Sequence, residues 1–129
     1  MLRMKTGKII PNGVSLEKHE YDTILLFTEM GLDVELIPRS NQKGIRTPDI
    51  VMEGLKWEIK SPTGKGRWLL ENTLQKASRQ SSNVIIDLNR IKIHQIKCLQ
   101  ELEKQFHKSK GVKHLKVITK AKKVVEFKK

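Results

Sequence analysis

The sequence predicts a single α/β domain in which a mixed central β-sheet is flanked by helices. Two strand-like runs meet at Glu53-Gly54, which predicts a β-hairpin near the middle of the chain. Residues 83–88 form a continuous apolar run of strand length, typical of a central strand covered on both faces. Apolar residues recur at helical spacing before, between and after these strands. With 129 residues, the chain has the size of one domain.

Composition indicates a polyanionic partner. The net charge is +12, and the Lys and Arg residues are scattered along the chain rather than confined to a tail. Nucleic acid is the usual partner of such a protein, although binding to an anionic membrane or a need for solubility would account equally well for the excess of positive charge. No apolar run approaches the length of a membrane span or of a secretion signal. The single cysteine, Cys98, excludes an internal disulfide and a cysteine-rich zinc site.

The first helix is expected over residues 16–30, after a basic lead-in at residues 1–14 that contains at most a short strand. Ser15 is the expected N-cap, because its hydroxyl can accept a hydrogen bond from the first turn. Gly31 is the expected end of this helix.

One carboxylate lies on the apolar stripe of this helix. Glu20 follows Leu16 by four positions and precedes Ile24 by four, so it points toward the core side. A carboxylate there needs a partner. It is either a functional acid or an edge residue paired with its neighbours, and Glu17 is the alternative candidate one turn earlier.

A polar, basic loop precedes the hairpin. A strand is expected over residues 33–37, and residues 39–47 follow it as a loop. Three cationic side chains of this loop could hold a phosphate backbone, although surface loops are commonly basic in so basic a protein. They are Arg39, Lys43 and Arg46.

The hairpin separates an apolar face from a charged one. If Glu53 and Gly54 are its two loop residues, Asp49 stands opposite Glu58. Side chains alternate along a strand, so Lys60 shares the face of these two carboxylates. The other face is apolar and consists of Ile50, Met52, Leu55, Trp57 and Ile59.

Two directly opposed carboxylates repel each other unless a cation lies between them. Magnesium prefers such oxygen ligands, together with water and substrate phosphate. We therefore predict a metal site at Asp49 and Glu58, beside which Lys60 can orient a water or offset charge on a phosphodiester. The alternative is a solvated hairpin face with ordinary ion pairs.

The rest of the chain supplies further elements and few other chemical motifs. The turn at residues 61–66 lacks the full phosphate-loop pattern, and the histidines lack the spacing of a zinc site or a catalytic triad. Lys65 and Arg67 are nevertheless candidates for contact with nucleic acid. The expected elements are a helix at 67–80, a strand at 83–88, a helix at 94–108, and a basic hairpin with strands at 112–119 and 122–127.

The expected order of elements in the core, residues 15–88, resembles that of the PD-(D/E)xK nuclease superfamily. The resemblance rests on a carboxylate on the first helix, Pro48-Asp49 opening the second strand, and Glu58-Ile59-Lys60 on the third. The segment from Pro48 to Leu88 is similar to the C-terminal toxin domains of contact-dependent growth inhibition proteins (CdiA). Those domains are nucleases, and several are specific for transfer RNA.

The resemblance implies a restriction-endonuclease-like fold in which an αβββαβ core is followed by a C-terminal helix and hairpin at residues 89–129. It implies a metal-dependent nuclease with Asp49, Glu58 and Glu20 at the metal, Lys60 as the catalytic lysine and Gln80 as an accessory residue. Mg²⁺ is the expected cation, with Mn²⁺ and Zn²⁺ as alternatives.

Several alternatives remain open for the substrate and the cellular setting. Transfer RNA is the favoured substrate, a DNA endonuclease with the same site is the first alternative, and a non-catalytic basic nucleic-acid-binding module is the second. A cognate immunity protein is an expected partner. The expected site of action is the cytoplasm, either of a cell that receives a secreted toxin or, for an independent intracellular protein, of the cell that makes it.

Overall fold

The computed structural model describes residues 5–129, so residues 1–4 of the expected lead-in lie outside the described part. The strands are β1 (Ile9–Ile10), β2 (Val34–Leu36), β3 (Ile50–Met52), β4 (Leu55–Lys60), β5 (Asn83–Asp87), β6 (His114–Ile118) and β7 (Val124–Lys128). The helices are α1 (Lys18–Glu29), α2 (Leu69–Ser78) and α3 (Gln95–Lys108). Within residues 5–129, no helix is both long and apolar enough to cross a membrane.

The seven strands form one mixed sheet whose spatial order is the order of the chain, β1 to β7. β5 is parallel to both of its neighbours, β4 and β6, which confirms the expected central strand. The hairpins β3–β4 and β6–β7 are antiparallel, whereas β1 pairs in parallel with β2. The predicted α/β class and mixed sheet are confirmed.

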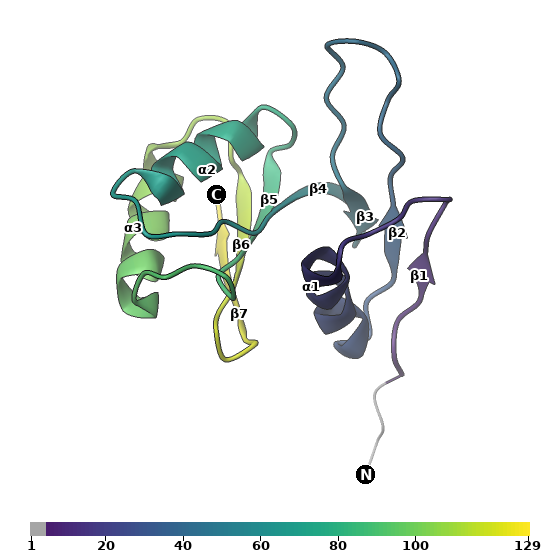
Figure 1. Ribbon diagram of the computed structural model, residues 1–129, viewed down its shortest axis with the longest axis horizontal. Helices are drawn as coiled ribbons and strands as arrows, with labels where there is room; N and C mark the ends of the chain where they lie inside the picture. The colour runs from purple at the N-terminus through teal and green to yellow at the C-terminus, as the bar shows by residue number, and fades with distance from the viewer. Residues whose placement is uncertain (1–4) are drawn as a thin grey trace.

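The helices cover opposite faces of this sheet. Ile24 and Phe27 of α1 pack with Trp57 of β4 in one core cluster. Val84 and Ile86 of β5 point the other way, into a second cluster with α2 and α3. Figure 1 shows α1 beside the β1–β3 part of the sheet and α2 with α3 beside the β5–β7 part. Strand β4 therefore lies where the two helical layers meet.

The central hairpin has the predicted register. Ile50 pairs with Trp57, and Met52 pairs with Leu55. The turn residues Glu53 and Gly54 have φ values of 55° and 76°, the left-handed pair that a type I′ turn requires. The expected apolar face is wrong at one position, because Leu55 is 41% exposed. Leu55 follows the turn directly, at the end of β4 that the buried core cluster does not include.

Helix α1 begins later than predicted, because another residue caps it. Ser15 is not the N-cap; Glu17 is, and its backbone N–H donates to Glu20 Oε1 at 3.0 Å in a reciprocal capping box. One turn further on, Thr23 Oγ1 donates to Asp87 Oδ2 of β5 at 2.6 Å. That buried bond fixes the rotation of α1 against the sheet.

One lysine of the C-terminal hairpin is buried and does not belong to its basic edge. Lys116 of β6 is only 6% exposed, and its ammonium lies 2.8 Å from Glu53 Oε1 at the tip of the central hairpin. The same ammonium lies 5.3 Å from the centre of the Trp57 ring. This lysine therefore stabilises the packing of β6 against the β3–β4 turn, and it is not available to a ligand.

Candidate active site

The register of the central hairpin brings two carboxylates together at one end of β4. Asp49 directly precedes β3, and its backbone N–H donates to the carbonyl of Trp57 at 2.9 Å. Its carboxylate Oδ2 also accepts the N–H of Ile59 at 2.8 Å. Asp49 is thus held against β4 by two bonds, in the position opposite Glu58 that the sequence predicts.

Glu58 is a buried acid among polar partners. The residue is 3% exposed, and Lys60 Nζ lies 3.2 Å from its Oε2. Gln80 lies beside Glu58, and when the oxygen and nitrogen of its side-chain amide are exchanged, the NH₂ group donates to both oxygens of Glu58, at 3.0 Å for Oε1. Burial, and then the hydrogen bond and charge of Asp49, raise the pKa of Glu58 to about 8 against the opposing effect of Lys60. Without a cation, this pair of acids therefore holds a proton at neutral pH.

A cavity of about 320 Å³ opens onto these groups. The loop between β2 and β3, which projects well beyond the sheet in Figure 1, supplies one wall, and the start of α1 supplies another. All five predicted catalytic side chains line this cavity. The complete lining is Glu20, Arg39, Ser40, Ile45, Arg46, Thr47, Asp49, Glu58, Ile59, Lys60 and Gln80.

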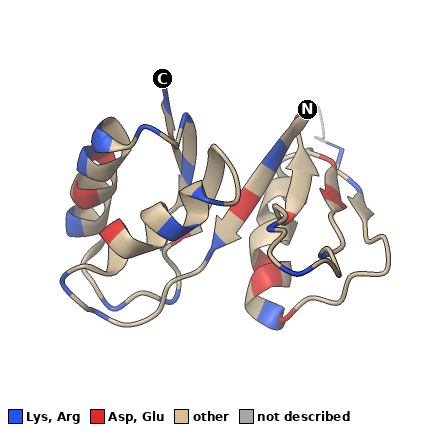
Figure 2. Ribbon diagram, turned by 90° about the horizontal axis from the view of Figure 1, so that it is seen from above, with Lys and Arg blue, Asp and Glu red and all other residues tan. Residues whose placement is uncertain are grey.

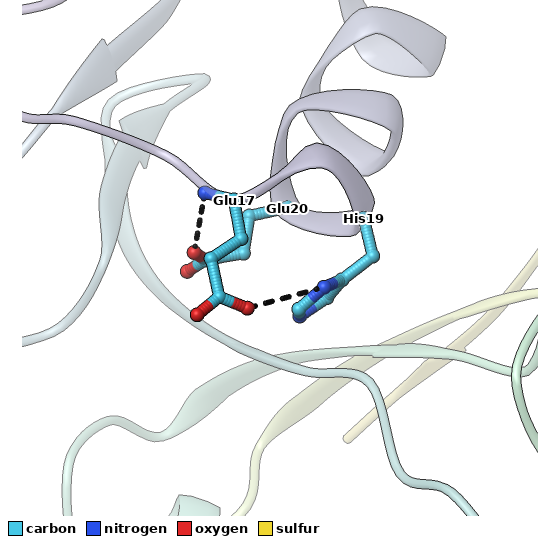
Figure 3. Close-up of side chains that lie close together, drawn as sticks. All are labelled: Glu17, His19 and Glu20. Atoms are coloured by element: carbon cyan, nitrogen blue, oxygen red, sulfur yellow. Dashed lines mark hydrogen bonds and ion pairs between the residues drawn. The ribbon is translucent and has the colours of Figure 1, made fainter.

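Glu20 reaches the cavity but is engaged at the start of its own helix. Its carboxylate accepts the N–H of Glu17, whose carboxylate in turn lies 3.5 Å from Nδ1 of His19 (Figure 3). Within residues 5–129, the cluster of three ligating side chains with atoms within 4.8 Å of one another is Glu17, His19 and Glu20. Within the described residues, Glu20, Asp49 and Glu58 do not form such a cluster, so the structure does not place Glu20 as a direct ligand beside the two hairpin acids.

The predicted contacts with nucleic acid separate into two groups. Arg39 and Arg46 line the cavity, whereas Lys43 lies in the same loop outside its lining. Lys65 and Arg67 line another cavity, of about 450 Å³, between the loop after β4 and helix α3. Of the three loop cations expected near the site, Arg39 and Arg46 therefore line the cavity, and contact of all five with nucleic acid stays a prediction.

Sequence analysis missed the basic residues of α3 that line this larger cavity. Lys97 and Lys104 line it, although the helix at 94–108 was expected only to pack against the core. Their spacing of seven residues places them on one helical face and is the signal that could have found them.

Comparisons with known proteins agree on one kind of protein. The family model for the contact-dependent growth inhibition CdiA C-terminal domain matches residues 46–124. Among solved structures, a chain of the CdiA-CT/CdiI toxin and immunity complex from Burkholderia pseudomallei is similar, with a TM-score of 0.69 and 15% identity. That match covers 95% of this chain and 100% of the other, and at this identity it shows the fold alone. No curated protein sequence matches.

Proposed function

Because the chain belongs to the family of contact-dependent growth inhibition CdiA C-terminal domains, we propose that it is a toxin domain that hydrolyses nucleic acid with a divalent metal ion. One observation carries this proposal: Asp49, Glu58, Lys60 and Gln80 converge on one cavity. We assign the site to the PD-(D/E)xK type, since an acid before one strand faces Glu-x-Lys on the next.

The donor set suits a hard cation. Asp49 and Glu58 offer carboxylate oxygens. Burial, followed by the hydrogen bond and charge of Asp49, raises the pKa of Glu58, and a cation bound between the two acids would lower it. Mg²⁺ fits these ligands better than Zn²⁺, which prefers nitrogen and sulfur, and Mn²⁺ is an alternative. When bound, the cation would activate a water and stabilise charge on the scissile phosphate.

The remaining side chains have separate roles in this proposal. The Lys60 ammonium, 3.2 Å from Glu58 Oε2, orients the attacking water or offsets the phosphate charge. The Gln80 amide holds the Glu58 carboxylate in place. Arg39 and Arg46 also line the cavity, where they can hold the phosphates that flank the scissile bond.

Transfer RNA is the substrate that we propose. The net charge of +12 suits a phosphate backbone, and the family resemblance favours RNA over DNA. We further propose a cognate immunity protein as partner, since the similar solved structure is a toxin and immunity complex. The proposed site of action is the cytoplasm of a cell that receives the toxin.

A cleavage assay tests this proposal. The purified protein is incubated with transfer RNA, ribosomal RNA or plasmid DNA in EDTA, and then with Mg²⁺, Mn²⁺ or Zn²⁺ added back. We expect Mg²⁺-dependent cleavage of transfer RNA and none by the Asp49→Asn/Glu58→Gln double variant, which controls for contaminating nucleases. Cleavage of plasmid alone would establish the DNA endonuclease. Binding without cleavage of any substrate would establish the non-catalytic module.

Glu20→Gln should weaken Mg²⁺ binding and reduce cleavage about tenfold or more, because a water-mediated ligand loses its charge. Glutamine at this position retains the capping box, so the fold should persist. The matched control is Glu17→Gln, which removes a 77% exposed carboxylate from the same helix start. Mg²⁺ titration and initial cleavage rates measure both effects. Equal losses of Mg²⁺ affinity and cleavage rate in the two variants would mean that Glu20 contributes only negative charge at the start of the helix and no specific contact.

A further inference from the structure

The larger cavity, between the loop after β4 and α3, is strongly cationic. Lys65 and Arg67 line it from the loop, and Lys97 and Lys104 line it from α3, against one acid, Glu101. Figure 2 shows Lys and Arg residues recurring along α3. The volume of about 450 Å³ is in the range of small-molecule sites, and four cations facing it favour an anionic occupant.

An exposed aromatic side chain stands next to this cavity. Trp68 is 57% exposed, whereas the other tryptophan, Trp57, is fully buried. The Arg67 guanidinium lies 4.8 Å from the centre of the Trp68 ring. An exposed indole with a neighbouring cation is the arrangement on which single-stranded bases stack.

Backbone contacts hold in place the segment that carries Lys65 to Trp68. Gly64 forms an isolated parallel bridge with Ile91, and its carbonyl accepts the N–H of Lys92 at 2.8 Å. Gly64 has a φ of 94°, which a residue with a side chain rarely adopts. The carbonyl of Gly66 accepts the N–H of Leu69 as α2 begins. The segment carrying Lys65 to Trp68 is therefore anchored at both ends.

The cavity is close to the candidate active site along the chain. Lys65 follows Lys60 by five positions, so their Cα atoms are at most about 18 Å apart. A smaller hollow of about 230 Å³, lined by Lys60, Thr63 and Lys76 among others, lies along this segment. A strand of about five stacked nucleotides spans such a length, since each adds about 3.4 Å.

We propose that the larger cavity and Trp68 form a subsite for an unpaired nucleotide of the strand that the active site holds. The base stacks on Trp68, and its phosphates contact Lys65, Lys97 and Lys104. A paired base cannot leave its stack without cost, so the subsite selects single-stranded segments near the scissile bond. This inference deepens the proposed function and rests on nucleic acid being the partner.

Tryptophan fluorescence in EDTA tests the subsite without any cleavage. The probes are a 12-nucleotide single-stranded RNA, the same sequence as a duplex, and poly-glutamate. We expect the single strand to quench Trp68, while buried Trp57 supplies an unchanged background, and the duplex to bind more weakly. Trp68→Ala should weaken single-strand binding by roughly five- to a hundredfold, measured by anisotropy of a labelled strand. Trp68→Phe should retain most of the affinity.

Two controls match these variants. Tyr21→Ala removes a 45% exposed aromatic from α1, and Lys110→Ala removes a charge outside the cavity; both should bind normally. Lys104→Ala should weaken binding and lower the salt dependence by about one phosphate contact.

Unchanged binding by Trp68→Ala and Lys104→Ala would reject the subsite, as would equal affinity for duplex. Equal quenching by poly-glutamate would instead identify a surface for an acidic protein. Quenching by single-stranded RNA without cleavage of any nucleic acid would reject the nuclease and retain the subsite.

Discussion

Glu58→Gln should abolish metal-dependent cleavage and at the same time stabilise the metal-free protein at pH 8. The cleavage rate should fall by at least a hundredfold, because the variant loses one of the two carboxylates that would hold the cation. The gain in stability follows from burial. Glu58 is 3% exposed beside Asp49, so its ionised form is costly, and glutamine has the same shape without the charge.

The pH dependence distinguishes this explanation from a general effect on packing. The pKa of Glu58 is raised from 4.5 to about 8 in the folded protein, so between these values the folded state binds a proton that the unfolded state has released. Stability therefore falls as pH rises from about 4.5 to about 8, and then levels off. The total is on the order of a few kcal/mol, which corresponds to roughly ten degrees or more in Tm. Glu58→Gln removes this dependence.

Thermal melts in EDTA at pH 4.5 and pH 8 measure the effect. The variant should match the wild type at pH 4.5 and exceed it at pH 8. Glu103→Gln is the control, since its carboxylate is 58% exposed on α3 and should change neither stability nor cleavage. A lower Tm for Glu58→Gln at pH 8 would mean that the ionised acid stabilises the fold, contrary to the account given for its pKa.

Lys60→Arg should reduce kcat by about a hundredfold or more and change KM much less. The variant keeps the positive charge, but arginine stays protonated and presents a broad fork in place of a compact ammonium. The Lys60 side chain is 30% exposed at 3.2 Å from Glu58, so the larger group also has little room beside the acid. A loss of this size is typical of a missing proton-transfer group.

Single-turnover cleavage of the best substrate separates kcat from binding. Lys56→Arg is the matched control, because Lys56 is an exposed residue of the same strand, outside the cavity lining. Near-normal turnover of Lys60→Arg would show that only the charge of Lys60 contributes. Lys60→Met should then be the damaging variant, since it removes that charge.

The central part of the fold follows from sequence because its signals are local. Alternating side chains and the Glu53-Gly54 turn set the hairpin register, and the continuous apolar run marks β5. Each helix and strand for which residue bounds are predicted lies within two residues of them. The pairing of β1 with β2 has no such signal, since two isoleucines carry no periodicity. The start of α1 was misplaced because Ser15 and Glu17 are both possible caps, and only the reciprocal bond with Glu20 decides between them.

The site was predictable where strand alternation determines it. Asp49, Glu58 and Lys60 share a face for that reason, whereas Gln80 comes from another layer and was expected from the family resemblance alone. The sequence gives no reason to distinguish the structural roles of Asp49 and Glu58. In the structure, however, the Asp49 carboxylate also accepts a hydrogen bond from the backbone N–H of Ile59. Its replacement by alanine should therefore cost stability, unlike that of Glu58, because a backbone donor is left unpaired. Lys97 and Lys104 of α3 could not be predicted as part of a cavity, because the sequence does not show which face of this helix lies against the loop after β4.

The sheet order has a consequence for how the chain folds. Each strand pairs with the next one in the sequence, so no strand must wait for a distant partner before it can be added. Closing the longer connections costs little extra, because loop entropy grows only logarithmically with length. The single cysteine means that no disulfide within the chain has to form. The chain can thus assemble its sheet progressively, strand by strand, without an oxidising step.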